Sequence, residues 1–138
     1  MLRAHRSGTL IEQVFCAFLG ATPREDFIAY VADFFLQLER VKWTVIAGVV
    51  NDTLVISVRN LGYSKNAGEF ARRYFSDIGN AGGHRAMAKA VVPLRAFREK
   101  FGELDAESFS TRLQELAHEF LQHDPQTSPE KKREAVRS

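Results

Sequence analysis

The chain has 138 residues, of which 45% are apolar and 26% are charged, and its formal net charge is only +2. This profile is typical of one soluble globular domain with a sizeable core. The single cysteine, Cys16, excludes an internal disulfide and a thiolate metal cage. Because no apolar run is long enough for a secretion signal or a membrane span, we expect a cytoplasmic protein without membrane contact.

The N-terminal third of the chain predicts two helices. The first is expected over residues 9–20, because Thr9 and Glu12 match a capping box and Gly20 is a helix terminator. The second is expected to follow the Thr22-Pro-Arg-Glu25 sequence, with Pro23 in the first turn. It has a broad apolar stripe formed by Phe27, Ile28, Val31, Phe34, Phe35 and Leu38. Core packing is the expected use of this stripe, and contact with a partner chain is the alternative.

The middle of the chain predicts a β-hairpin. Residues 43–50 are β-branched and apolar, Asn51-Asp52 is a turn signal, and residues 53–59 alternate in polarity. Arg59 is expected at the end of the second strand, where its planar guanidinium can bind a phosphate or a carboxylate. An ordinary surface arginine at a strand end is the alternative.

The C-terminal half predicts helices separated by a short strand. A helix capped by Asn66 is expected to run to Gly79, and a strand is expected over residues 89–92. Pro93 is expected to begin a helix that Gly102 ends, and Asp105 is expected to cap the last helix. The sequence after His123 is polar and rich in proline, which predicts a disordered tail over residues 124–138.

Residues 79–90 combine three glycines with His84 and Arg85. Backbone N–H groups of a glycine-rich turn can form a concave anion site, to which His84 and Arg85 would add donors. Residues 59–98 contain eight basic and two acidic side chains, a net charge of +6, which leaves −4 for the rest of the chain. This local excess suits a phosphorylated ligand, although a plain helix-to-strand turn and solvated helix faces would also fit.

The order of these motifs resembles the DHHA1 domain, the C-terminal substrate-binding domain of the DHH family phosphoesterases. The resemblance covers roughly residues 25–101 and is based on the strand ending Ser-Val-Arg59-Asn60, the next helix, and Ala81-Gly-Gly-His84. It implies an α/β fold, with a mixed β-sheet flanked by helices and additional N- and C-terminal helices. It also implies an N-terminal helix or linker segment over residues 1–22 and a DHHA1-like domain over residues 23–123.

By this resemblance, Arg59, Gly82, Gly83, His84 and Arg85 would bind the phosphate groups of a nucleotide or short oligonucleotide. Lys89 departs from the small residues that are usual at its position, so it would either crowd the loop or add a phosphate contact. Hydrolysis in the family resembles two-metal chemistry with manganese or magnesium, held by a separate domain with an Asp-His-His signature. That signature is absent from the sequence, so we expect no cofactor, metal ligand or catalytic residue in this chain.

The sequence therefore predicts the substrate-recognition half of a DHH-type phosphoesterase, a hydrolase or phosphodiesterase that is not catalytic as this isolated chain. Its expected partners are the nucleotide ligand and a DHH catalytic domain. Two alternatives stay open: a nucleic-acid-binding accessory module, as in alanyl-tRNA synthetase-like proteins, or a homodimerisation domain that uses the stripe around Phe34 and Phe35.

Overall fold

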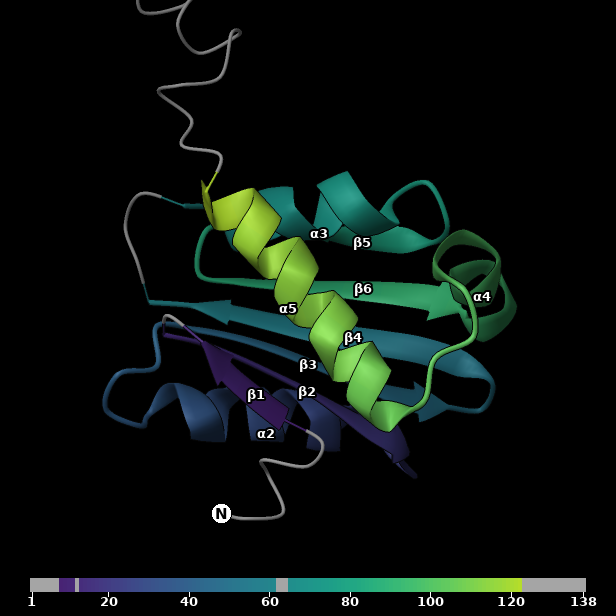
Figure 1. The fold of residues 1–138 in the computed structure, drawn as a ribbon, viewed down its shortest axis with the longest axis horizontal. Helices are drawn as coiled ribbons and strands as arrows, with labels where there is room; N and C mark the ends of the chain where they lie inside the picture. The colour runs from purple at the N-terminus through teal and green to yellow at the C-terminus, as the bar shows by residue number, and fades with distance from the viewer. Residues whose placement is uncertain (1–7, 12, 62–64, 123–138) are drawn as a thin grey trace, which may run out of the picture.

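A computed structural model describes residues 8–11, 13–61 and 65–122 of the chain. Its strands form one six-stranded sheet in the order β1-β2-β3-β4-β6-β5 (Figure 1). The pair β2–β3 is parallel and the other four pairs are antiparallel. The elements are β1 (Gly8–Ile11), β2 (Val14–Ala21), α2 (Glu25–Leu36), β3 (Trp43–Val50), β4 (Thr53–Asn60), α3 (Ala67–Phe75), β5 (Asn80–Gly83), β6 (Met87–Pro93), α4 (Leu94–Phe101) and α5 (Ala106–Gln122). The predicted α/β class, a mixed sheet flanked by helices, is confirmed.

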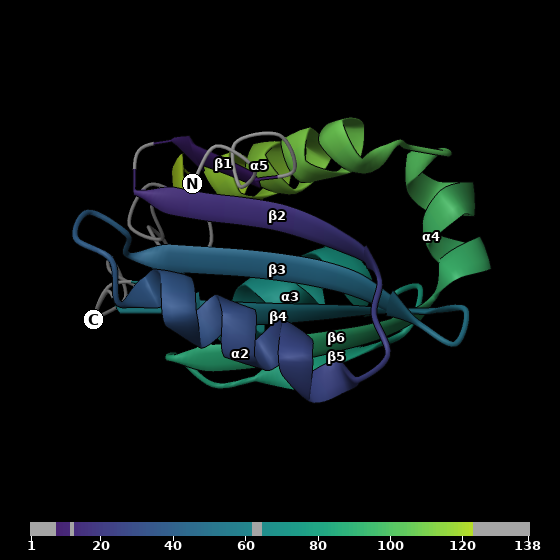
Figure 2. The same ribbon diagram turned by 90° about the horizontal axis from the view of Figure 1, so that it is seen from below.

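The two faces of the sheet are covered unequally. The helices α3 and α5 pack on one face, where Phe70, Phe75, Phe97 and Leu113 are fully buried in the larger core cluster. On the opposite face α2 alone packs against β3 and β4, and Ile28 and other residues form a smaller cluster there (Figure 2). Because a single helix cannot cover six strands, the β5–β6 side of this face stays open.

The predicted hairpin is confirmed by β3 and β4. Val50 pairs with Thr53, and the two turn residues Asn51 and Asp52 have positive φ angles of 50° and 62°. This is the conformation that suits the twist of a two-residue hairpin. Alternate residues of β4 therefore point to opposite faces, so Ser57 and Arg59 lie on the α2 side.

The helix predicted over residues 9–20 is wrong, because the structure forms β1 and β2 there. Residues 14–17 are all buried, with Val14 and Cys16 in the larger cluster and Phe15 and Ala17 in the smaller one. A strand that is buried on both faces has an uninterrupted apolar sequence, which also satisfies helical spacing. Gly20, with φ of 74°, lies at an irregularity in the β2–β3 pairing and ends no helix, and Glu12 lies outside the described residues.

The start of the second predicted helix also differs from the prediction. Thr22 does not cap α2. Its N–H donates to the carbonyl oxygen of Val49 at 2.8 Å, so Thr22 continues the pairing of β2 with β3. The helix begins at Glu25, after an Arg24 whose side chain makes no capping bond. The apolar stripe is divided, because Ile28 is buried whereas Phe27, Phe34 and Leu38 are exposed.

The C-terminal elements follow the prediction more closely. Asn66 caps α3 by accepting a hydrogen bond from Glu69 N–H at 3.0 Å, although α3 ends at Phe75, before Gly79. The side chain of Asp105 accepts from Ser108 N–H at 2.8 Å, which confirms the predicted cap of the last helix. The predicted strand and the helix after Pro93 are confirmed as β6 and α4. The predicted disordered tail lies outside the described residues.

Candidate functional site

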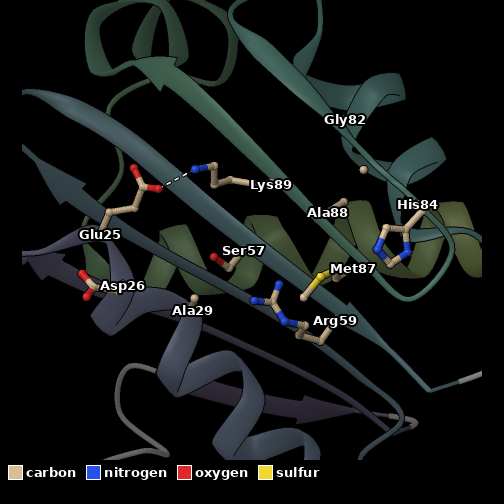
Figure 3. A pocket seen from close by; sticks show the side chains of 11 residues that line it. Glu25, Asp26, Ala29, Ser57, Arg59, Gly82, His84, Met87, Ala88 and Lys89 are labelled. Atoms are coloured by element: carbon tan, nitrogen blue, oxygen red, sulfur yellow. Dashed lines mark hydrogen bonds and ion pairs between the residues drawn. The ribbon is translucent and has the colours of Figure 1, made fainter.

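A pocket of about 570 Å³ lies where α2 leaves the sheet uncovered (Figure 3). Its floor and one wall come from β4, β5 and β6, and its other wall is the first turn and a half of α2. The lining residues are Glu25, Asp26, Ala29, Ser57, Arg59, Gly82, Gly83, His84, Met87, Ala88 and Lys89. Segments that are far apart in the sequence therefore meet at one place on the surface.

The glycine-rich stretch is an edge strand rather than the turn that the sequence indicates. Residues 80–83 form β5, which pairs antiparallel with β6 and places Gly82 opposite Lys89. Residues that pair across strands point to the same face, so a side chain at position 82 would point toward the pocket. A Cβ built on Gly82 has no atom within 4 Å, whereas a Cβ on Gly83 would lie 2.4 Å from the carbonyl oxygen of Met87.

Arg59 is the penultimate residue of β4 and is mostly buried, with 11% of its side chain exposed. Its Nε donates to Asp33 Oδ1 at 2.7 Å, and its Nη1 donates to the carbonyl oxygen of Val58 at 3.0 Å. A guanidinium has five N–H donors. In the described part of the chain three of them are unused, including both on Nη2, and Figure 3 shows the guanidinium facing into the pocket. Arg59 is thus held in place and still has donors for an anion.

His84 lies in the short loop between β5 and β6. Its ring Nδ1 accepts a hydrogen bond from Ala86 N–H at 3.3 Å, and the main-chain N–H of His84 donates to the carbonyl oxygen of Met87 at 2.9 Å. A neutral imidazole that accepts at Nδ1 carries its proton on Nε2. The ring therefore presents a hydrogen-bond donor to the pocket.

The loop is anchored by main-chain hydrogen bonds from α3. The N–H groups of Ala67 and Gly68 donate to the carbonyl oxygens of Arg85 and His84, both at 3.0 Å. Asn66 satisfies the next two N–H groups of the helix. All four N–H groups of the first turn, which would otherwise be free to bind an anion, are therefore used inside the protein.

The side chain of Asn60, whose role the sequence reasoning missed, is a second anchor of this loop. It is 4% exposed, and its Nδ2 donates to the carbonyl oxygens of Lys65 at 2.9 Å and Arg85 at 3.1 Å. A polar residue that follows an arginine at a strand end gives no sign of this role in the sequence. Asn60 thus fixes the position of the His84 loop relative to Arg59.

The acidic wall is the part of the site that the sequence did not indicate. Glu25 forms an ion pair with Lys89, and Asp33 forms one with Arg59. Both carboxylates belong to α2, which is far from the basic segment in the sequence and meets it only after folding. The pocket's charged lining residues, Glu25, Asp26, Arg59 and Lys89, therefore sum to zero when His84 is neutral. The positive excess counted over residues 59–98 is not concentrated in this pocket.

Four of the five predicted phosphate-binding residues, Arg59, Gly82, Gly83 and His84, line the pocket together. The fifth, Arg85, does not line it. Its carbonyl oxygen instead accepts hydrogen bonds from Ala67 N–H and Asn60, so its structural contribution is through the main chain.

Ser57 adds a polar group to the floor of the pocket. The residue is only 2% exposed, and its side chain points into the pocket in Figure 3. No group in the described part of the chain hydrogen-bonds its hydroxyl. A hydroxyl that faces a pocket can donate to or accept from a ligand there.

The described residues offer little to a metal or to thiol chemistry. Among them, no group of three or more His, Cys, Asp or Glu side chains is arranged to hold a metal ion. Cys16 is fully buried and burial raises the pKa of its thiol, as expected of an apolar core residue. No helix in the described ranges has the length and apolar character that a bilayer crossing needs.

Comparisons with known proteins identify relatives in fold but no established family. No family model matches the chain. An uncharacterized protein of Methanocaldococcus jannaschii is 33% identical over 82 residues, which are 59% of this chain, and the match spans only 16% of the length of that relative.

Two solved structures share the fold. The C-Ala domain of Aquifex aeolicus alanyl-tRNA synthetase superposes with a TM-score of 0.55 at 15% identity, over 79% of this chain and 96% of that one. An exopolyphosphatase-related protein from Bacteroides fragilis superposes with a TM-score of 0.51 at 13% identity, over 78% of this chain and 33% of that one. These likenesses support a DHHA1-like fold.

Proposed function

We propose that this chain is the substrate-recognition part of a DHH-type phosphoesterase, and that the pocket binds phosphate groups of a nucleotide or short oligonucleotide. One observation carries the proposal: the strand-end Arg59 and the loop residue His84, 25 positions apart in the sequence, face the same pocket with unused donors. Charge-assisted bonds from arginine to phosphate are about twice as strong as neutral hydrogen bonds, and the planar guanidinium can make two of them in parallel. Hydrolysis would require a metal-bearing domain outside the described residues.

Two further features support the binding of a phosphate near Arg59 and His84. Gly82 leaves open space in front of β5, so a ligand oxygen can come close to the main chain. Lys89 lies opposite Gly82 on β6, and its ammonium group, which pairs with Glu25, is a second cation of the pocket. Lys89 is therefore placed to contact a ligand in the pocket, which favours the second of the two roles expected for it.

The test is a calorimetric titration of the chain with a 5′-phosphorylated trinucleotide at low salt, for the wild type and for Arg59→Lys, Arg59→Ala and His84→Ala. We expect saturable binding that weakens about tenfold or more for each alanine variant, because a hydrogen bond to a charged group contributes about 1.5–3 kcal/mol. The lysine variant keeps the positive charge but lacks the planar guanidinium with its parallel donors. Its affinity for the trinucleotide should therefore lie between those of the wild type and Arg59→Ala.

The matched control is Arg95→Ala, which removes an exposed arginine from α4, away from the pocket. It should bind like the wild type. Thermal unfolding of every variant separates lost binding from lost structure. Binding that is equally weakened by Arg95→Ala, or unaffected by Arg59→Ala and His84→Ala, would contradict the proposal.

A nucleic-acid-binding accessory module is the second candidate, and the observation that favours it is the superposition with the C-Ala domain of alanyl-tRNA synthetase. In that case structured RNA would bind more tightly than a trinucleotide. Arg72 and Arg73, in the last turn of α3, would contribute more than Arg59. The same titration with a short RNA hairpin and an Arg72→Ala, Arg73→Ala double variant distinguishes the two functions.

A further inference from the structure

The pocket has two ends of opposite chemical character. In Figure 3, Arg59, His84 and Gly82 lie toward one end, Glu25 and Asp26 lie at the other, and Ser57 lies between them. One end therefore offers hydrogen-bond donors, and the other offers two carboxylates, of which Glu25 pairs with Lys89 and Asp26 pairs with Arg24. A ligand that is only an anion would leave the free oxygens of these carboxylates without a donor.

The ion pair between Lys89 and Glu25 places a further requirement on the ligand. If a phosphate drew Lys89 away, the Glu25 carboxylate would lose its counter-charge close to the new negative charge. Two negative charges that close together repel each other, and the repulsion is stronger at a protein surface than in bulk water. The ligand must therefore bring donor groups to Glu25 at the same time as it brings phosphate oxygens to the basic end.

We infer that the pocket selects nucleotides with ribose over those with deoxyribose, with the sugar hydroxyls donating to the Glu25 and Asp26 carboxylates and the phosphate accepting from Arg59 and His84. This deepens the proposed function and rests on it. A nucleoside monophosphate carries a phosphate and a pair of vicinal hydroxyls within one small molecule. Carboxylates are suited to bind such hydroxyls, because they have only acceptor oxygens.

Ser57 and Met87 fit the same ligand. The buried Ser57 hydroxyl lies on the floor between the two ends, where it can donate to or accept from a sugar oxygen. Met87 is 41% exposed at the rim, next to the loop that holds His84. Its flexible thioether side chain offers an apolar surface for a base without demanding a particular one.

The test is a calorimetric titration of the full chain with adenosine 5′-monophosphate and with 2′-deoxyadenosine 5′-monophosphate. We expect the ribonucleotide to bind about tenfold more tightly, which corresponds to one hydrogen bond to a charged acceptor. In the double variant Glu25→Gln, Asp26→Asn this ratio should fall toward one, even if phosphate affinity rises because Lys89 is released. The ratio reports on sugar recognition independently of overall affinity.

Glu107→Gln is the matched control, since Glu107 is an exposed carboxylate in the first turn of α5 and does not line the pocket. It should keep the wild-type ratio. If both nucleotides bind equally in the wild type and Arg59→Ala abolishes both, the phosphate site stands and the ribose inference fails. If neither nucleotide binds, or if the ratio survives in the double variant, the ribose inference is overturned, and the first of these results overturns the proposed function as well.

Discussion

Adjacent glycines in β5 allow the packing of this strand to be tested by two nearly identical substitutions. Gly83 has a φ of 149°, which residues with a side chain rarely adopt. A Cβ there would lie 2.4 Å from the carbonyl oxygen of Met87 and 2.5 Å from Cα of Ala88. Both are main-chain atoms, so rotation of a side chain cannot relieve the contact. Gly82 is not among the described glycines with positive φ, and its Cβ would meet no atom within 4 Å.

We predict that Gly83→Ala destabilises the fold strongly and that Gly82→Ala does not. The unfavourable backbone conformation costs about 1–3 kcal/mol, and forcing a methyl group into packed strands costs about 1–3 kcal/mol more. Total stability of such domains is about 5–15 kcal/mol, so the loss is a large fraction of it. At about 4 °C per kcal/mol, the melting temperature should fall by roughly 8 °C or more. Gly82→Ala should stay within about 1 kcal/mol of the wild type.

Urea denaturation followed by circular dichroism measures both variants, and the nucleotide titration then adds a functional readout. The methyl group of Gly82→Ala points into the pocket, so this variant should fold normally and bind phosphate more weakly. Equal stability of Gly83→Ala and the wild type would refute the described strand pairing. Unchanged binding by a folded Gly82→Ala would refute close approach of the ligand to β5.

Three further substitutions test other contacts. Asp33→Asn removes the carboxylate that competes for Arg59, so phosphate should bind about two- to fivefold more tightly, as judged by calorimetry; weaker binding would contradict the competition. Asn60→Ala removes the hydrogen bonds to the carbonyl oxygens of Lys65 and Arg85, of which Arg85 keeps the bond from Ala67 N–H, and should lower the free energy of unfolding in urea by about 1–3 kcal/mol; an unchanged midpoint would contradict the anchoring role. Burial and the hydrogen bond to Glu119 raise the pKa of Tyr74 to about 12. The unfolded chain therefore loses the Tyr74 proton first, near pH 10, and stability should fall between about pH 10 and 12 more steeply in the wild type than in Tyr74→Phe. Equal slopes in the two proteins would contradict the raised pKa.

The sequence predicted correctly those elements whose formation depends on residues close to one another in the chain. The β3–β4 hairpin depends on a two-residue turn and on strict alternation, and the starts of α3 and α5 depend on the caps Asn66 and Asp105. Each of these features involves residues only a few positions apart, so the sequence displays them directly. Arg59 was placed correctly at the end of β4 for the same reason.

The misassigned elements depend on contacts between distant segments. The apolar residues of β2 are buried by α2 on one face and by α5 on the other. The spacing of these residues also fits a helix, and only their burial on both faces favours a strand. The two ion pairs of the pocket join α2 to β4 and β6, which are distant in the sequence. Local charge counting therefore found the basic side of the site and missed the carboxylates that oppose it.

The way the His84 loop is anchored determines how readily the side chains at positions 84 and 85 can be replaced. The loop is held through the carbonyl oxygens of His84 and Arg85, which accept from α3 and from Asn60. Main-chain acceptors are the same for every amino acid, so the side chains at positions 84 and 85 contribute to the anchoring only through the bond from Ala86 N–H to His84 Nδ1. These two positions are therefore suited to a substitution library for altered ligand preference, in which most members should fold and differences in binding would reflect recognition alone.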